Sequence, residues 1–122
     1  MYKTQKAIPL STDFSRGFDN PVLFLIFNRP DTTQKVFDVI KQVKPKYLFV
    51  AADGPRPDHP NDREKCQKAR ATIEQVDWDC DVKTLFREEN LGCGVAVSGA
   101  ITWFFEHVEM GILLNETIHK RS

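Results

Sequence analysis

Apolar residues are concentrated in four short runs, and mixed or polar segments separate these runs. The runs at residues 22–27 and 47–52 are apolar at nearly every position, which is typical of strands covered on both faces in a parallel sheet. Shorter runs follow at residues 82–86 and 110–114. The pattern therefore predicts four strands.

The segments between these runs carry apolar residues three or four positions apart, which predicts amphipathic helices. Asp31 is the expected N-cap of the first helix, which ends before Pro45, and Asn61 is the expected N-cap of the second. The third helix follows a glycine-bearing loop at residues 87–94. The order β-α-β-α-β-α-β predicts an α/β fold with three layers, α/β/α, around a mainly parallel four-stranded sheet.

Length and composition limit how the chain is organised. Its 122 residues, 41% of them hydrophobic, suffice for one compact domain and not for two. We expect an irregular arm at residues 1–20, the α/β domain at residues 21–116 and a short polar tail at residues 117–122.

Charge, cysteine content and the first 20 residues limit the partners, the metal sites and the cellular location that we expect. The 17 lysines and arginines balance the 17 aspartates and glutamates, so no basic field exists to hold nucleic acid. The three cysteines are odd in number and form no C-x-x-C pair, which argues against a disulfide framework and a zinc site. The first 20 residues contain neither a signal-peptide core nor a membrane span. We therefore expect a cytoplasmic protein.

Polar side chains directly follow the first three predicted strands, and the carboxyl ends of parallel strands meet at one rim, where such sheets bind ligands. Asp53 can accept hydrogen bonds from ribose hydroxyls or a base N–H, and Gly54 lets the main chain approach a ring closely. Arginine side chains offer planar forks for phosphate oxygens. The combination predicts a nucleotide site formed by Asn28, Arg29, Asp53, Gly54, Arg56, Arg87, Asn90, Gly92 and Gly94.

Structural interpretations of the same residues stay open. An Asp-Gly pair at a strand end is a common turn element, and exposed arginines are usually solvated charges. Gly92 and Gly94 are also compatible with a simple turn into the third helix. A dinucleotide-binding domain is excluded, because its first strand-to-helix turn must be glycine-rich and residues 28–31 contain no glycine.

Three sequence motifs resemble those of a known family. F-N-R-P ends the first strand, A-A-D-G-P-R ends the second, and R-E-E-N-L-G-C-G leads into the third helix. In this order they resemble the nucleotide-binding half of GT-A fold glycosyltransferases, the nucleotide-diphospho-sugar transferases, over residues 21–116. The resemblance implies that Asn28 and Arg29 lie near the nucleotide and that Asp53 holds the base or ribose. It also implies that the loop at residues 87–94 borders the sugar diphosphate.

The resemblance further implies a divalent cation, Mn²⁺ or Mg²⁺, held against the diphosphate by an acidic motif after the fourth strand. Asn115, Glu116 and Thr117 stand at those positions. A hard cation needs several oxygen ligands and one carboxylate is a poor clamp, so we expect weak cation binding or none. The chain ends at Ser122, before the acceptor-binding half of that family. The resemblance therefore implies a truncated glycosyltransferase-like domain that binds a nucleoside diphosphate sugar without transferring it alone.

Two alternatives remain. One is a non-catalytic interaction module that binds no nucleotide and forms homo-oligomers through the apolar strand at Gly111 to Leu114. The other is an active transferase in which a partner chain supplies the acceptor-binding half. Measurements of nucleoside diphosphate sugar binding, self-association and turnover distinguish the three hypotheses.

Overall fold

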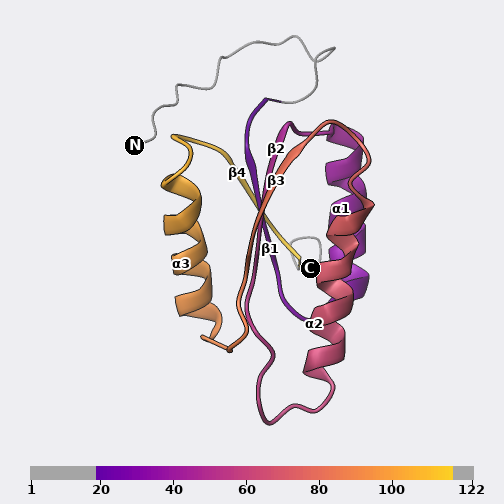
Figure 1. Ribbon diagram of the computed structural model, residues 1–122, viewed down its shortest axis with the longest axis vertical. Coiled ribbons are helices and arrows are strands. Elements are labelled where there is room, and N and C mark those ends of the chain that lie inside the picture. The colour runs from indigo at the N-terminus through magenta and orange to yellow at the C-terminus, as the bar shows by residue number, and fades with distance from the viewer. Residues whose placement is uncertain (1–18, 117–122) are drawn as a thin grey trace, which may run out of the picture.

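The chain forms an α/β structure of three layers in the computed structural model, which describes residues 19–116 (Figure 1). The elements in chain order are β1 (Val22–Ile26), α1 (Pro30–Val43), β2 (Tyr47–Ala52), α2 (Asp62–Ala71), the 3₁₀ turn η2 (Thr72–Gln75), β3 (Asp81–Phe86), α3 (Cys93–Phe105) and β4 (Ile112–Asn115). Helices α1 and α2 lie on one side of the sheet and α3 on the other (Figure 1). The predicted fold class is confirmed. The predicted tail and most of the predicted arm lie outside the described residues.

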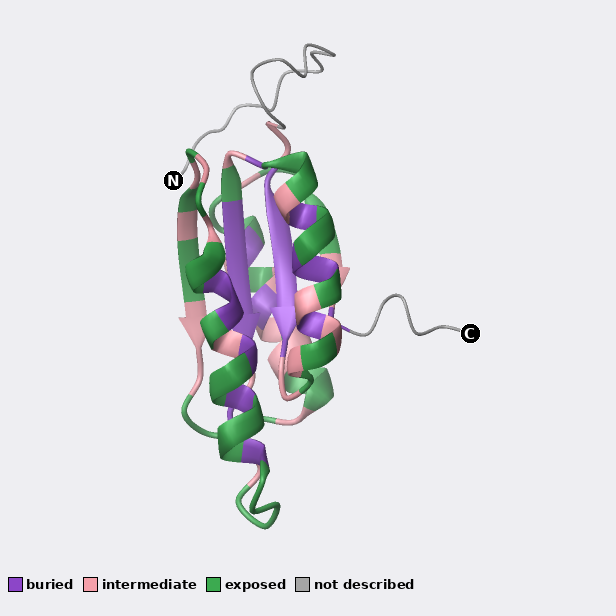
Figure 2. Cartoon of the chain, turned by 90° about the vertical axis from the view of Figure 1, so that its right-hand side faces the viewer, coloured by how far each residue is buried: buried purple, intermediate pink, exposed green. Residues whose placement is uncertain are grey.

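All four strands are parallel, in the order β3-β2-β1-β4. Val22 of β1 pairs with Leu48 of β2 on one side and with Ile112 of β4 on the other. Strand β1 is buried at every position and β2 at every position except Tyr47, which explains their unbroken apolar runs (Figure 2). Strands β3 and β4 are consequently the two edges of the sheet.

Alternate side chains of the central strands enter two different hydrophobic cores. On the side of α1 and α2, Phe24 and Val50 belong to a cluster that includes Phe37 of α1. On the other side, Phe49 of β2 meets Phe104 of α3 edge-on, with ring centroids 5.0 Å apart. The period of two along a strand therefore divides each apolar run between the two faces of the sheet.

Some predicted element boundaries are wrong. Helix α1 begins at Pro30 and has Arg29 rather than Asp31 at its N-cap position, because the fixed φ of proline suits the first helical residue. Helix α3 begins at Cys93, so the last two residues of the predicted glycine-bearing loop are helical. Strand β4 begins two residues later than predicted, at Ile112.

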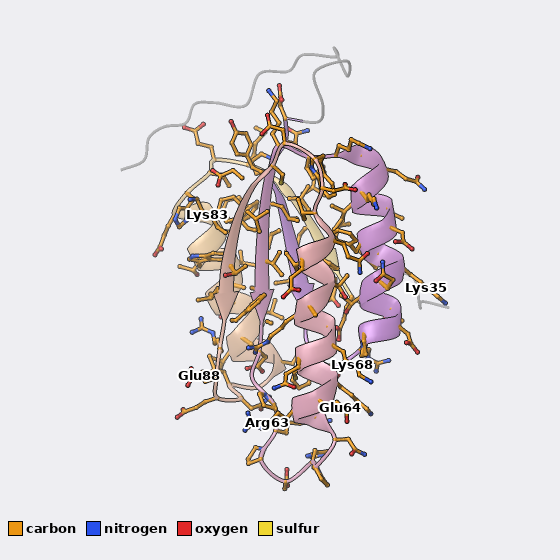
Figure 3. The ribbon with its side chains drawn as sticks, turned by 45° about the vertical axis from the view of Figure 1, so that its right-hand side comes forward. Lys35, Arg63, Glu64, Lys68, Lys83 and Glu88 are labelled. Atoms are coloured by element: carbon orange, nitrogen blue, oxygen red, sulfur yellow. The ribbon has the colours of Figure 1, made fainter. Side chains whose placement is uncertain are left out.

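Helix α2 separates its charged side chains from its core-facing ones. Arg63, Glu64 and Lys68 project from its outer face, away from the sheet (Figure 3). Glu64 and Lys68 form an i,i+4 ion pair of 3.3 Å on this exposed face. Within residues 19–116, no helix has both the length and the apolar character that crossing a bilayer requires.

Candidate functional site

The carboxyl ends of the four strands border one pocket of about 470 Å³. Leu25, Ala51 and Leu85 contribute from the sheet, and Ala96 and Val97 contribute from α3, so the pocket lies on the face that α3 covers. Its volume is within the range of small-molecule sites. The pocket is at the rim where open α/β sheets bind ligands, as the positions of the strand ends predicted.

Most of the predicted site residues line this pocket. Each follows a different strand but reaches the same rim, and the contributors are Asn28 and Arg29 after β1, Asp53 and Arg56 after β2, and Arg87, Asn90 and Gly92 after β3. Asn115 and Glu116, at the end of β4, complete the lining on the other side.

Two of the predicted glycines lie outside the lining. Gly54 is buried, and a Cβ added there would stand 2.6 Å from the main-chain carbonyl of Glu89, so glycine lets two loops pack together. Gly94 lies in the first turn of α3, where a Cβ would meet nothing within 4 Å. Gly92, which does line the pocket, has a φ of 89° in the left-handed region that favours glycine.

The carboxylate of Asp53 is occupied by the protein itself. Its Oδ1 accepts hydrogen bonds from the main-chain N–H groups of Gly54 and Leu91, each at 2.8 Å. Its Oδ2 accepts from the N–H of Gly92 at 3.1 Å and from Nδ2 of Asn90 at 3.2 Å. A carboxylate has roughly four lone-pair positions. Asp53 therefore fixes the loop between β3 and α3 and has no lone pair left for a ligand in this arrangement.

Arg70 of α2 supports the same loop from the opposite side of the sheet. Its Nη2 donates to the carbonyl of Asp53 at 3.0 Å and to that of Arg87 at 2.7 Å, which joins the ends of β2 and β3. The guanidinium also lies 4.9 Å from the centre of the Phe86 ring. Burial lowers the pKa of Arg70. This role could not be predicted, because an arginine between two alanines of a helix has the local pattern of a solvated residue.

Asp62 is a second residue that the sequence did not indicate. Its side chain is 3% exposed, and Arg56 donates to it from Nε at 2.7 Å, from Nη2 at 3.0 Å and from its main-chain N–H at 3.1 Å. Asn28 donates a further hydrogen bond at 3.0 Å. Hydrogen bonds from the Arg56 side chain outweigh the opposing effect of burial and hold the pKa of Asp62 well below its usual range. Acidic residues are common in first turns of helices, so position alone could not single out Asp62.

The three pocket arginines consequently differ in their partners. Arg56 is committed to Asp62, and it also lies 5.7 Å from the centre of the Phe27 ring. Among the residues that the structure describes, the guanidinium groups of Arg29 and Arg87 form no hydrogen bond or ion pair. Two cations with open hydrogen-bonding capacity therefore face the pocket.

Glu116 caps the first turn of α1 from the end of β4. Its side chain is 4% exposed, and its Oε1 accepts hydrogen bonds from the N–H of Phe27 at 2.7 Å, from Oγ1 of Thr33 at 3.0 Å and from the N–H of Arg29 at 3.4 Å. Helix α1 makes no side-chain capping bond of its own. Burial raises the pKa of Glu116, against the opposing effect of these donors.

The residues present do not fit the divalent cation that the family resemblance implied. Glu116 would have to supply the carboxylate, but Oε1 is engaged by three donors, whereas Mg²⁺ and Mn²⁺ need several oxygen ligands. Within residues 19–116, no group of three or more His, Cys, Asp or Glu side chains is arranged to hold a metal ion. Thr117 lies outside the described residues.

The pocket thus combines an apolar floor with a basic rim, which suits a ligand that has a ring at one end and an anionic group at the other. Comparison of the chain with models of protein families, with curated proteins and with solved structures found no match. A functional assignment must therefore be argued from the residues of this pocket.

Proposed function

We propose that the pocket binds a nucleoside diphosphate sugar. The observation that carries the proposal is the convergence of the three glycosyltransferase-like motifs on one cavity. Residues 27–29, Asp53 with Arg56, and Arg87 with Asn90 and Gly92 all contribute to its lining. A single ligand that contacts all three motifs would explain why segments far apart in the sequence line the same pocket.

The shape and chemistry of the pocket accord with such a ligand. The apolar side chains of Leu25, Leu85 and Val97 offer a surface for a base or a sugar ring. The guanidinium groups of Arg29 and Arg87 offer bidentate donors for phosphate oxygens. In this proposal Asp53 acts indirectly, because it holds the loop that carries Asn90 and Gly92 in place.

We propose that this site binds the nucleoside diphosphate sugar but does not transfer the sugar by itself. A transferase of the inverting kind needs a general base near the acceptor, and the two carboxylates that line the pocket have other roles. Asp53 accepts four hydrogen bonds from its own loops, and Glu116 caps α1. Transfer would therefore need a base from outside this pocket.

Calorimetry with a panel of nucleoside diphosphate sugars tests the proposal directly. We expect one or more of the uridine, thymidine, guanosine, cytidine and adenosine derivatives to bind with one site per chain. The free sugar and the free nucleoside serve as controls for which part of the ligand is recognised. Absence of heat for every member of the panel, with and without Mn²⁺, would exclude the proposed function.

A self-associating module is the second candidate, and the two sheet edges favour it. Strand β4 is an edge strand whose Ile112 and Leu113 are 38% and 42% exposed, and it contains no charged residue. The opposite edge strand β3 carries the charged residues Asp81 and Lys83, and charged side chains protect an edge from pairing. Only one edge is therefore suited to pair with a second copy. Sedimentation equilibrium tests this, and a monomer at high concentration would contradict it.

A further inference from the structure

The side of the pocket that would face a diphosphate has open arginines where the family resemblance implied a cation. Arg29 and Arg87 line the pocket, and within residues 19–116 their guanidinium groups make no hydrogen bond. Glu116, which stands in the place of the acidic motif, has its Oε1 occupied by three donors. The groups in this pocket that are suited to neutralise an anion are therefore arginine side chains and not a metal ion.

We propose that the pocket binds the diphosphate of its ligand through Arg87 and Arg29, without a divalent cation. This inference rests on the proposed function and adds how the charge of the ligand is balanced. A diphosphate presents several oxygens that share negative charge, and two guanidinium forks can each receive a pair of them. Such hydrogen bonds to charged groups are stronger than neutral ones, which lets them replace a metal in holding the group.

Arg87 is the better placed of the two arginines because its backbone is fixed on both sides. Its N–H donates to the carbonyl of Ala52 at 3.0 Å, and its own carbonyl accepts from Arg70 at 2.7 Å. Its half-buried side chain extends along α3, where a Cβ added to Gly99 would stand 3.2 Å from Nη2. The glycine therefore gives the guanidinium room between the helix and the pocket. A donor held in this way needs little reorganisation when the ligand binds.

Arg29 approaches from the opposite wall. It occupies the N-cap position of α1 and its side chain is exposed. Its main-chain N–H donates to Oε1 of Glu116, and its positive charge also favours the ionised form of that carboxylate. Arg29 and Arg87 follow β1 and β3, on either side of β2, so a diphosphate over the end of β2 can contact both.

A cation at Glu116 would disturb the fold at this point. A cation that binds through Oε1 would compete with two main-chain N–H groups and with Oγ1 of Thr33, which is fully buried. Donors shielded from water that lose their acceptor destabilise the fold. Binding of a metal in the usual place is therefore opposed by the capping of α1.

The first experiment measures binding of the five common nucleoside diphosphates to the full chain by calorimetry, in EDTA and in Mn²⁺. We expect the dissociation constant of the ligand that binds to differ by less than about threefold between the two conditions. Binding that appears only in Mn²⁺ would overturn this inference and leave the proposed function intact. Absence of binding in both conditions would overturn both.

The second experiment compares Arg87→Ala with Arg63→Ala. Both variants remove one arginine and one positive charge, but Arg63 is an exposed residue of α2 that does not line the pocket. We expect Arg87→Ala to lower the affinity for the nucleoside diphosphate by about tenfold or more, whereas Arg63→Ala should keep the native affinity. Arg87→Lys should restore only part of the loss, because lysine has no planar fork.

The matching nucleoside, which has no phosphate, separates anion binding from damage to the pocket. We expect it to bind Arg87→Ala and the native chain equally. The role of Arg87 would be overturned if Arg87→Ala lost affinity for the nucleoside and for the diphosphate equally. It would also be overturned if Arg87→Ala bound the diphosphate with native affinity. The guanidinium has no hydrogen-bond partner within residues 19–116, so the variant should keep the native melting temperature.

Discussion

Oε1 of Glu116 accepts a hydrogen bond from Oγ1 of Thr33 at 3.0 Å, and both side chains are buried although they are 83 positions apart. The bond joins the end of β4 to the first turn of α1. The carboxylate also accepts from the N–H groups of Phe27 and Arg29, so it fulfils the capping role that no side chain of α1 performs. Glu116 is therefore a structural residue of the fold.

Replacement of Glu116 tests this capping role. Glu116→Ala should lower the free energy of unfolding by about 1–3 kcal/mol, because the buried hydroxyl of Thr33 and the N–H groups of Phe27 and Arg29 lose their acceptor. Glu116→Gln keeps an amide oxygen for these donors and removes a buried charge, so it should be at least as stable as the native chain near neutral pH. Urea unfolding measures both. Equal losses in the two variants would show that the charge itself is required.

The pH dependence of the Gln variant provides a second test. Burial raises the pKa of folded Glu116, so the folded state holds the proton more tightly than the unfolded state, whose pKa is about 4.3. Stability from this group therefore increases as the pH falls through the raised pKa. The stability of the native chain relative to Glu116→Gln should be greater near pH 5 than near pH 7, in contrast to the result for an exposed glutamate.

Asp62 should show the opposite dependence on pH. Its pKa in the folded state is lowered, chiefly by the hydrogen bonds of the Arg56 side chain, so ionised Asp62 stabilises the fold above its unfolded pKa of about 3.9. This stabilisation is lost as the pH falls toward the folded pKa. Asp62→Asn should unfold at lower urea than the native chain near neutral pH, and the difference should shrink below about pH 4. A difference that stays constant with pH would contradict the assignment.

Alanine substitutions at three glycines should separate close packing from free space. A Cβ at Gly111 would stand 2.4 Å from the ring of Phe104, which is buried and cannot move aside, and one at Gly54 would meet the main chain of Glu89 at 2.6 Å. Both variants should lose about 1–3 kcal/mol of stability. Gly94→Ala, in the first turn of α3, should gain up to about 1 kcal/mol, because the space is open and alanine favours helix. Thermal unfolding of the three variants measures these changes.

Self-association through β4 can be tested with a lysine on that strand. Leu113→Lys should dissociate an oligomer that forms through this edge, because pairing would bury the added charge. Val39→Lys is the matched control, since Val39 is 55% exposed but belongs to helix α1 and not to the sheet edge. Sedimentation equilibrium at several concentrations gives the readout. Dissociation by both variants, or by neither, would argue against the β4 edge.

Cys93 provides a chemical probe of the pocket. It is exposed and lines the cavity, whereas Cys66 is buried and burial raises its pKa. Burial also raises the pKa of Cys80 to about 11. Iodoacetamide should therefore label Cys93 first, and a nucleoside diphosphate that occupies the pocket should slow this labelling. Mass spectrometry locates the label, and unchanged labelling at saturating ligand would place the ligand elsewhere.

The sequence predicted the parts of the structure that depend on local patterns. The runs at residues 22–27 and 47–52 were recognisable as strands covered on both faces because both faces of β1 and β2 are buried. The rim of the pocket was predictable because its residues directly follow strand ends. The order of strands was not, since an apolar run does not identify its neighbours in the sheet.

The contacts that organise the site could not be predicted because they join distant parts of the chain. Asp62 is 34 positions from Asn28, and Glu116 is 89 positions from Phe27. Arg70 reaches two carbonyl groups that belong to different strand ends. Residue type and spacing show that such side chains can form hydrogen bonds, but the partners are set by tertiary packing.

The capping of α1 by Glu116 also has a consequence for how the protein is made. During synthesis α1 leaves the ribosome long before β4, so its first turn lacks the Glu116 acceptor until residue 116 has emerged. The pairing of β1 with β4, from Val22 to Ile112, is delayed in the same way. Contacts of such long sequence separation form slowly. A nascent chain that stops short of β4 would therefore expose both an unpaired side of β1 and an unfinished helix to chaperones.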